Sequence, residues 1–176
     1  DIRKDTLNID ETLLENAITK NTKAIIVVHY AGVSCEMDTI MAIAKKHNIL
    51  VVEDNAHGLF GKYKGIPLGT IGDFATLSFH ETKNISCGEG GALLVNSESL
   101  LQRAEIIIEK GTNRSQFING QIDKYSWVDK GSSYVLSDLL AALLYGQLEN
   151  SEEIQLKRRV IWERYFTGLS EWASSY

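Results

Sequence analysis

The strongest constraint on the fold is an alternation of short apolar runs with a segment of helical spacing. Ala24–Val28 is a continuous apolar run rich in β-branched residues, and Ile49–Val52 is a second such run. Between them, Met37–Ala44 places its apolar residues on one face of a helix. The order strand, helix, strand predicts two parallel strands joined by a crossover helix, with both strands buried on both faces of the sheet.

The remaining segments extend this α/β pattern along the chain. Further expected elements are a helix at Asp10–Ile18, a turn or hairpin at Tyr63–Gly69, strands at Phe74–Phe79 and Ala92–Val95, and helices at Ser97–Lys110 and Ser137–Leu169. We therefore predict an α/β fold with a mostly parallel sheet, followed by a long helical segment.

Charge and composition argue against several classes of protein. The net charge is −5 with both signs mixed along the chain, so no basic block indicates nucleic acid or an anionic membrane surface as a partner. The longest apolar runs, such as Ala24–Val33, are too short to span a bilayer. Cys35 and Cys87 are too few and too far apart for a disulfide framework or a metal site. This cysteine usage is typical of the reducing cytoplasm.

Polar residues gather where the predicted strands end. In an open α/β sheet, ligands bind beyond the carboxyl ends of the strands. His29–Tyr30 follows the first strand, Asp54 and His57 follow the second, and Ser78–Lys83 lies at the carboxyl end of the third. We therefore expect a carboxylate, an imidazole, a hydroxyl and an amine to meet in one crevice.

This set of groups suits pyridoxal phosphate. The cofactor needs a lysine for covalent attachment and an acid that keeps its pyridine nitrogen protonated. It also needs hydroxyl or backbone donors for its phosphate. Lys83, Asp54 and Ser78 are the candidates for these three roles.

Simpler interpretations of the same residues stay open at this point. A loop lysine is most often a solvated charge, Asp54 can be a turn or helix cap, and His57 can be purely structural. Glu53–Asp54 with a later lysine also resembles the magnesium site of receiver domains. The first strand ends in His29 rather than in an acid, which argues against that site.

Two longer stretches, "VVEDNAHG" and "SFHETKNISCGEGGALLVN", closely resemble the DegT/DnrJ/EryC1/StrS family of sugar aminotransferases. Glu53–His57 is similar to the family's "EDAAH", Ser78–Asn84 to its "SFHxxKN", and Gly88–Gly91 to its "GEGG". Asn55 stands where the family usually has alanine. The resemblance implies a pyridoxal-phosphate enzyme of fold type I.

The resemblance also implies roles for individual residues. Lys83 would hold the cofactor and later move the proton, Asp54 would pair with the pyridine nitrogen, and Ser78 would reach the phosphate. His57 would touch the cofactor ring or its 3′-oxygen. Ser133 takes the place of an asparagine that, in many relatives, reaches the phosphate of the neighbouring subunit's cofactor. A cytoplasmic homodimer with shared active sites is thus expected.

The reaction implied by the most similar branch of the family transfers an amino group from glutamate to C4 of dTDP-4-keto-6-deoxyglucose. Alternatives are amination of another nucleotide-linked ketosugar, at C3 or with GDP or UDP as carrier, and a cofactor-free regulatory or binding protein. A dehydratase of the same fold is disfavoured, because that branch has histidine in place of the lysine.

Family members are considerably longer than this chain. By the resemblance, residues 1–136 are the central part of the cofactor-binding large domain. Residues 137–176 are a long helix and the start of the C-terminal small domain. We therefore expect the chain to hold an incomplete active site.

Overall fold

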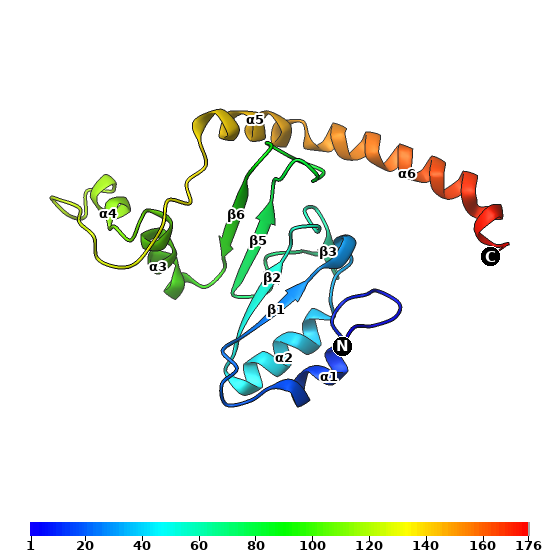
Figure 1. Cartoon of the computed structure of the whole chain (residues 1–176), viewed down its shortest axis with the longest axis horizontal. Helices are drawn as coiled ribbons and strands as arrows, with labels where there is room; N and C mark the ends of the chain where they lie inside the picture. The colour runs from blue at the N-terminus through cyan, green and yellow to red at the C-terminus, as the bar shows by residue number, and fades with distance from the viewer. Residues whose placement is uncertain (176) are drawn as a thin grey trace.

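A mostly parallel four-stranded sheet organises the chain, as predicted. The computed structural model describes residues 1–175. The sheet has the order β1-β2-β5-β6, formed by Ala24–Val28, Leu50–Asp54, Phe74–Ser78 and Gly91–Val95. β1, β2 and β5 are parallel, whereas β6 runs antiparallel to β5 (Figure 1).

Two helices, α1 (Glu11–Ala17) and α2 (Met37–His47), lie together on one side of the sheet (Figure 1). α2 connects β1 to β2 and ends at Asn48, whose left-handed backbone lets its amide bond to the carbonyls of Ala44 and Lys45. The core under these helices is built from apolar side chains of both layers, including Ile25, Val27, Met37, Ile40, Ala44 and Val51. Burial of this layer fixes the strand–helix–strand unit that carries the site.

The other face of β1 and β2 is open, so the prediction that these strands are buried on both faces is wrong. Ile26 is 65% exposed and Leu50 is 41% exposed, whereas Ile25, Val27 and Val51 are buried. Side chains alternate between the two faces of a strand, and both α1 and α2 lie on the same face. The apolar residues of the opposite face therefore have no described helix over them.

The connections match the expected pattern in most places. β3 (Lys62–Tyr63) and β4 (Ile66–Pro67) form the predicted hairpin, and a 3-10 turn, η1, covers Tyr30–Gly32. α3 (Glu98–Ile108) packs against β6, and the short helix α4 (Arg114–Ile118) follows it.

The predicted C-terminal helical segment is divided in two. α5 covers Asp138–Glu149 and α6 covers Ser151–Ala173, with non-helical backbone at Asn150 between them. The Asn150 side chain donates to the Gly146 carbonyl at 2.7 Å and thereby ends α5. Figure 1 shows α5 across the ends of β5 and β6, with α6 leading away from the sheet. Within residues 1–175, no helix combines the length and apolar character needed to cross a membrane.

Candidate active site

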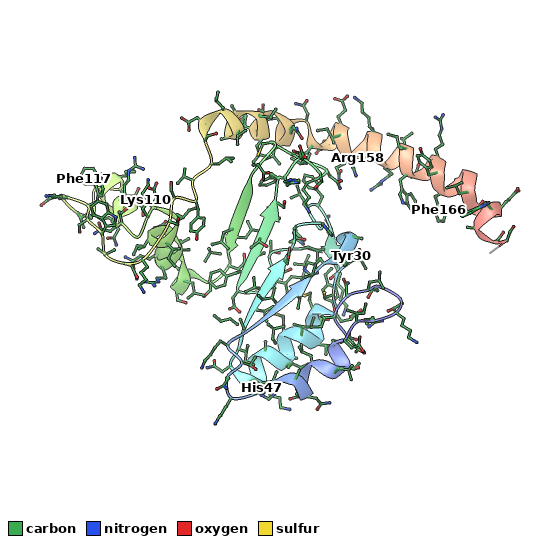
Figure 2. All side chains as sticks on the ribbon, in the orientation of Figure 1. Tyr30, His47, Lys110, Phe117, Arg158 and Phe166 are labelled. Atoms are coloured by element: carbon green, nitrogen blue, oxygen red, sulfur yellow. The ribbon has the colours of Figure 1, made fainter. Side chains whose placement is uncertain are left out.

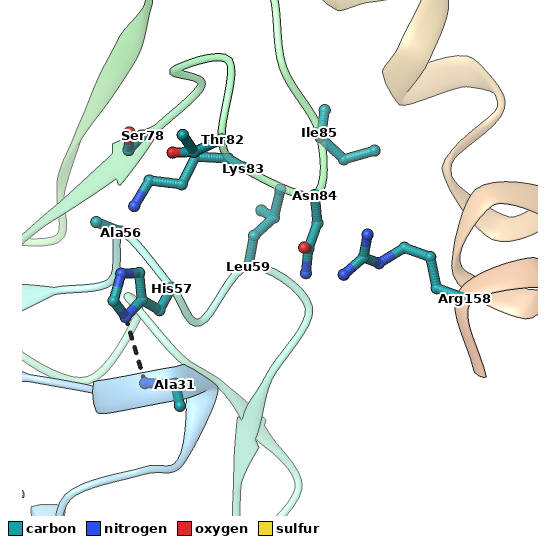
Figure 3. Close-up of a pocket in the computed structure, with 10 residues that line it drawn as sticks. All are labelled: Ala31, Ala56, His57, Leu59, Ser78, Thr82, Lys83, Asn84, Ile85 and Arg158. Atoms are coloured by element: carbon teal, nitrogen blue, oxygen red, sulfur yellow. Dashed lines mark hydrogen bonds between the residues drawn. The ribbon is translucent and has the colours of Figure 1, made fainter. Parts of the chain in front are cut away.

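A cavity of about 480 Å³ lies at the carboxyl ends of β1, β2 and β5. Its walls come from the last residue of β5, from the loops after these three strands and from one residue of α6 (Figure 3). The lining residues are Ala31, Ala56, His57, Leu59, Ser78, Thr82, Lys83, Asn84, Ile85 and Arg158. Three of the predicted site residues, His57, Ser78 and Lys83, are thus brought together at the edge where the sequence placed them.

Lys83 is carried by a loop, residues 79–90, that is closed at its base. The Phe79 amide donates to the Gly90 carbonyl at 2.8 Å, and the Cys87 amide donates to the Phe79 carbonyl at 3.0 Å. Phe79, Ile85 and Cys87 are buried against apolar residues of α5 and its surroundings. This packing fixes the loop, while the half-buried Lys83 side chain extends into the cavity (Figure 3).

Ser78 and Asp54 end two adjacent strands. The Ser78 hydroxyl oxygen accepts a weak hydrogen bond from the His80 amide at 3.4 Å, so its own proton can still be donated to a ligand. Asp54 Oδ1 accepts from the Ala56 amide at 3.1 Å. Its other oxygen has no hydrogen-bond partner among residues 1–175. Asp54 is not a lining residue, but it directly precedes the segment that forms one wall.

His57 is held by a backbone contact. Its Nδ1 accepts from the Ala31 amide at 3.3 Å, so a neutral ring carries its proton on Nε2. The ring also lies 5.8 Å from that of Tyr30, tilted by 60°. These contacts orient an exposed imidazole at the mouth of the cavity (Figure 3).

His29, expected in the same crevice, is instead fully buried on the opposite face of the sheet. Its Nε2 donates to Glu53 Oε2 at 2.9 Å, and its Nδ1 accepts from the Cys35 amide at 3.2 Å. The Glu53 carboxylate accepts further hydrogen bonds from backbone amides, those of Gly69, Ile71 and Gly72. Burial alone would raise the pKa of Glu53, but these hydrogen bonds outweigh it and hold that pKa below its ordinary value.

Ser133 also lies away from the cavity. It is exposed and pairs with Glu109, next to the end of α3. No lining residue comes from its neighbourhood. Within this chain, Ser133 therefore does not meet the other predicted site residues.

The residues present fit pyridoxal phosphate. The cavity volume lies within the range of small-molecule sites. An amine, from Lys83, stands beside hydroxyls from Ser78 and Thr82, and none of the lining residues within 1–175 carries a carboxylate. The uncommitted oxygen of Asp54 lies at the adjacent strand end. Amine, hydroxyl and carboxylate are the groups that an aldehyde, a phosphate and a protonated pyridine require.

Sequence reasoning missed three polar lining residues, Thr82, Asn84 and Arg158. Thr82 and Asn84 flank Lys83, so their neighbourhood was a usable signal. Arg158 comes from α6, and only the tertiary fold brings it to the cavity (Figure 3).

Comparison with known proteins places these residues in a family. Residues 1–175 match the DegT/DnrJ/EryC1/StrS aminotransferase family. The spore coat polysaccharide biosynthesis protein SpsC of Bacillus subtilis is 38% identical over 175 residues, which are 97% of this chain and 45% of SpsC. The chain spans less than half the length of the curated relatives it matches, 44% and 45% for two of them.

Solved structures give the same result. The aminotransferase from Psychrobacter cryohalolentis has a TM-score of 0.88 and 30% identity, covering 99% of this chain and 45% of its own. The PLP form of Spr1654 from Streptococcus pneumoniae has a TM-score of 0.83 and 31% identity, covering 97% of this chain and 47% of its own. DesI, solved with its TDP-sugar product, has a TM-score of 0.74 and 29% identity, covering 87% of this chain and 37% of its own.

Proposed function

The chain belongs to the DegT/DnrJ/EryC1/StrS aminotransferase family, and on that basis we propose that it supplies the lysine-bearing part of a pyridoxal-phosphate-dependent nucleotide-sugar aminotransferase. The observation that carries the proposal is the Lys83 side chain in a cavity shared with Ser78 and His57 and free of carboxylates. By "full-length enzyme" we mean the protein of the relatives' length in which this chain would lie.

When bound, pyridoxal phosphate supplies an aldehyde that can carry an amino group and a ring that withdraws electrons from the neighbouring carbon. Lys83 Nζ would hold the cofactor covalently, and as a free amine it would move a proton between the amino donor and the sugar carbon. Asp54 would keep the proton on the pyridine nitrogen, and Ser78 Oγ would donate to the phosphate. His57, oriented by the Ala31 amide, would touch the cofactor ring or its 3′-oxygen.

The finer proposal concerns the substrate. We propose transfer of an amino group from glutamate to C4 of dTDP-4-keto-6-deoxyglucose, as in the dTDP-4-amino-4,6-dideoxygalactose transaminase of enterobacterial common antigen assembly. The likeness of "GSSYVLSDLLAA" (Gly131–Ala142) to that branch supports this choice. A TDP-sugar product is bound by DesI, which has a similar fold. Another nucleotide-linked ketosugar is the alternative.

We further propose a domain division and a dimeric assembly for the whole enzyme. Residues 1–136 would belong to the large domain, and residues 137–176 would lead into the small domain. Ser133 lies outside the cavity of its own chain, and we propose that it reaches the cofactor of a second subunit in a cytoplasmic homodimer.

Reduction with borohydride in the presence of pyridoxal phosphate, followed by peptide mass mapping, tests the central assignment. In the full-length enzyme we expect the label on Lys83, loss of the label in Lys83→Arg, and an unchanged label in the control Lys64→Arg, whose amine pairs with Asp38 outside the cavity. Asp54→Asn should weaken cofactor binding roughly tenfold or more, because a charge-assisted hydrogen bond is lost. Absence of selective labelling would leave a cofactor-free binding protein as the better explanation.

A further inference from the structure

The cavity has a second cationic residue besides Lys83, namely Arg158 of α6. None of the ten lining residues is an aspartate or glutamate. The two cations outnumber the free carboxylate beside the cavity, that of Asp54, so this concave site attracts a further anion. The charge of Lys83 is assigned to the cofactor, so the charge of Arg158 is left for another group.

Arg158 has no ion-pair partner among residues 1–175. On a helix, side chains three and four residues apart are neighbours. For Arg158 these positions hold Gln155, Ile161, Ile154 and Trp162, none of which is acidic. By contrast, the neighbouring Lys157 is neutralised within α6, because its Nζ lies 2.6 Å from Glu153 Oε1. The guanidinium of Arg158 is therefore not neutralised by its own helix.

The direction of the Arg158 side chain also supports the binding of an anion at this edge of the cavity. Figure 3 shows the Arg158 guanidinium leaving α6 toward the Asn84 amide, at the edge of the cavity. Ser78 lies at the other side, beyond Lys83, in the same view (Figure 3). An anion at Arg158 is thus separated from the phosphate position assigned to Ser78.

We propose that Arg158 binds an oxyanion of a substrate, with Asn84 positioned to donate a further hydrogen bond. This inference rests on the proposed function of the cavity. A guanidinium recognises carboxylate and phosphate through paired N–H donors. Both the amino donor, through a carboxylate, and a nucleotide-linked sugar, through its diphosphate, carry such a group.

Equilibrium binding distinguishes the two sources without relying on turnover. The probes are 2-oxoglutarate for the donor side and dTDP for the sugar side, titrated by calorimetry into the cofactor-loaded full-length enzyme. In Arg158→Met we expect the Kd of one probe to rise roughly tenfold to hundredfold, because a charged pair of hydrogen bonds is lost. The Kd of the other probe should remain unchanged. Arg158→Lys should give an intermediate Kd for the affected probe.

Arg159→Met is the matched control. Arg159 follows Arg158 on the same helix and is exposed, but it does not line the cavity. Both Kd values should stay within about twofold of wild type in this variant. Thermal unfolding and borohydride labelling at Lys83 report whether each variant keeps its fold and its cofactor site.

Three results would overturn the inference. One is an unchanged Kd for both probes in Arg158→Met, and another is failure of both probes to bind wild type. The third is weaker binding of pyridoxal phosphate itself, which would assign Arg158 to the cofactor. In each case, selective labelling of Lys83 would still support the proposed function. Failure of the inference about Arg158 is therefore distinguishable from failure of the proposed function.

Discussion

Glu53 and Asp54 are neighbours in the sequence but lie on opposite faces of the sheet. Side chains alternate along a strand, so Glu53 is buried on the face of α1 and α2, whereas Asp54 faces the other side. The Glu53 carboxylate is fully occupied by four hydrogen bonds, one of them from His29. Glu53 therefore fixes the segment before β5, and Asp54 is the acid of this pair that a ligand can reach.

Replacing Glu53 with glutamine should lower the free energy of unfolding by about 3 kcal/mol at pH 7, because an amide nitrogen would face backbone N–H donors. The pKa of Glu53 is lowered in the folded chain from an ordinary value of 4.5. Its contribution is therefore complete above that pH and is lost as the pH falls through the lower, folded-state pKa.

Urea unfolding between pH 7 and pH 3, followed by circular dichroism, measures this effect. The difference between wild type and Glu53→Gln should shrink as the pH falls below about 4.5. The control is Glu163→Gln, a change at an exposed residue. Its free energy of unfolding should lie within about 0.5 kcal/mol of that of wild type. A difference that does not change with pH would contradict the assigned role of the carboxylate.

At the residue scale, the sequence predicted the cavity residues correctly where two signals agreed, namely a position at the end of a strand and membership of a motif. Ser78, Lys83 and His57 were predicted to meet, and they line one cavity. His29 was expected beside them only because it follows a strand. The alternation of β1 already placed His29 on the buried face, with Ile25 and Val27. Asn55 is buried, and its Nδ2 donates to the Leu68 carbonyl at 3.0 Å, a contact that sequence comparison alone does not reveal.

At the scale of elements, the loop of residues 79–90 depends on close packing between its two ends. A Cβ added at Gly90 would lie 2.6 Å from Cys87 Sγ, which is far too close for two non-bonded atoms. Cys87 is buried and its amide closes the base of the loop on Phe79. The Ser86 amide donates to Gln147 Oε1 of α5 at 3.0 Å and ties the loop to that helix. Gly90 is therefore required for the shape of the lysine loop.

Gly90→Ala should destabilise the chain by about 2 kcal/mol, because the added methyl group overpacks a filled site. The clash is mainly with one atom, so Cys87→Ala should remove most of it. The double variant should then be more stable than the sum of the two single effects predicts, with a coupling of about 1 kcal/mol or more. Chemical unfolding of the four proteins of this cycle measures the coupling, and strict additivity would show that the clash does not determine the loop.

The elements themselves were largely predictable, because apolar runs and helical spacing report burial directly. β1 begins and ends at the predicted residues, and the hairpin lies where turn composition indicated it. The break at Asn150 was missed, since apolar residues continue at helical spacing on both sides of it. A single side-chain bond to Gly146 ends α5, and periodicity does not detect a local bond of this kind.

At the scale of the whole molecule, apolar side chains are exposed in several parts of residues 1–175, two of which lie on the sheet and on the C-terminal helix. One is the face of β1 and β2 that carries Ile26 and Leu50. The other is α6, where Trp162 and Phe166 stack on each other 4.8 Å apart yet remain 61% and 66% exposed. Figure 2 shows the side chains of α6 spreading outward along the part of the helix that leads away from the sheet. Pattern reasoning predicted burial on both faces of the strands because it assumes the complete layers of a domain.

Exposed apolar area of this extent predicts that the chain by itself self-associates and binds the dye ANS, because such patches are rarely left in water. Sedimentation velocity over a range of concentrations should show species larger than 19.6 kDa. Replacing Trp162 and Phe166 with glutamine should reduce both association and dye fluorescence. The same change at Tyr125 and Trp127, exposed aromatics near α4, controls for a general loss of aromatic surface. In the full-length enzyme, whose additional segments we propose to cover these surfaces, dye binding per molecule should be lower. If the chain stays monomeric and does not increase ANS fluorescence, the exposed face of β1 and β2 and the exposed side chains of α6 do not require a covering layer.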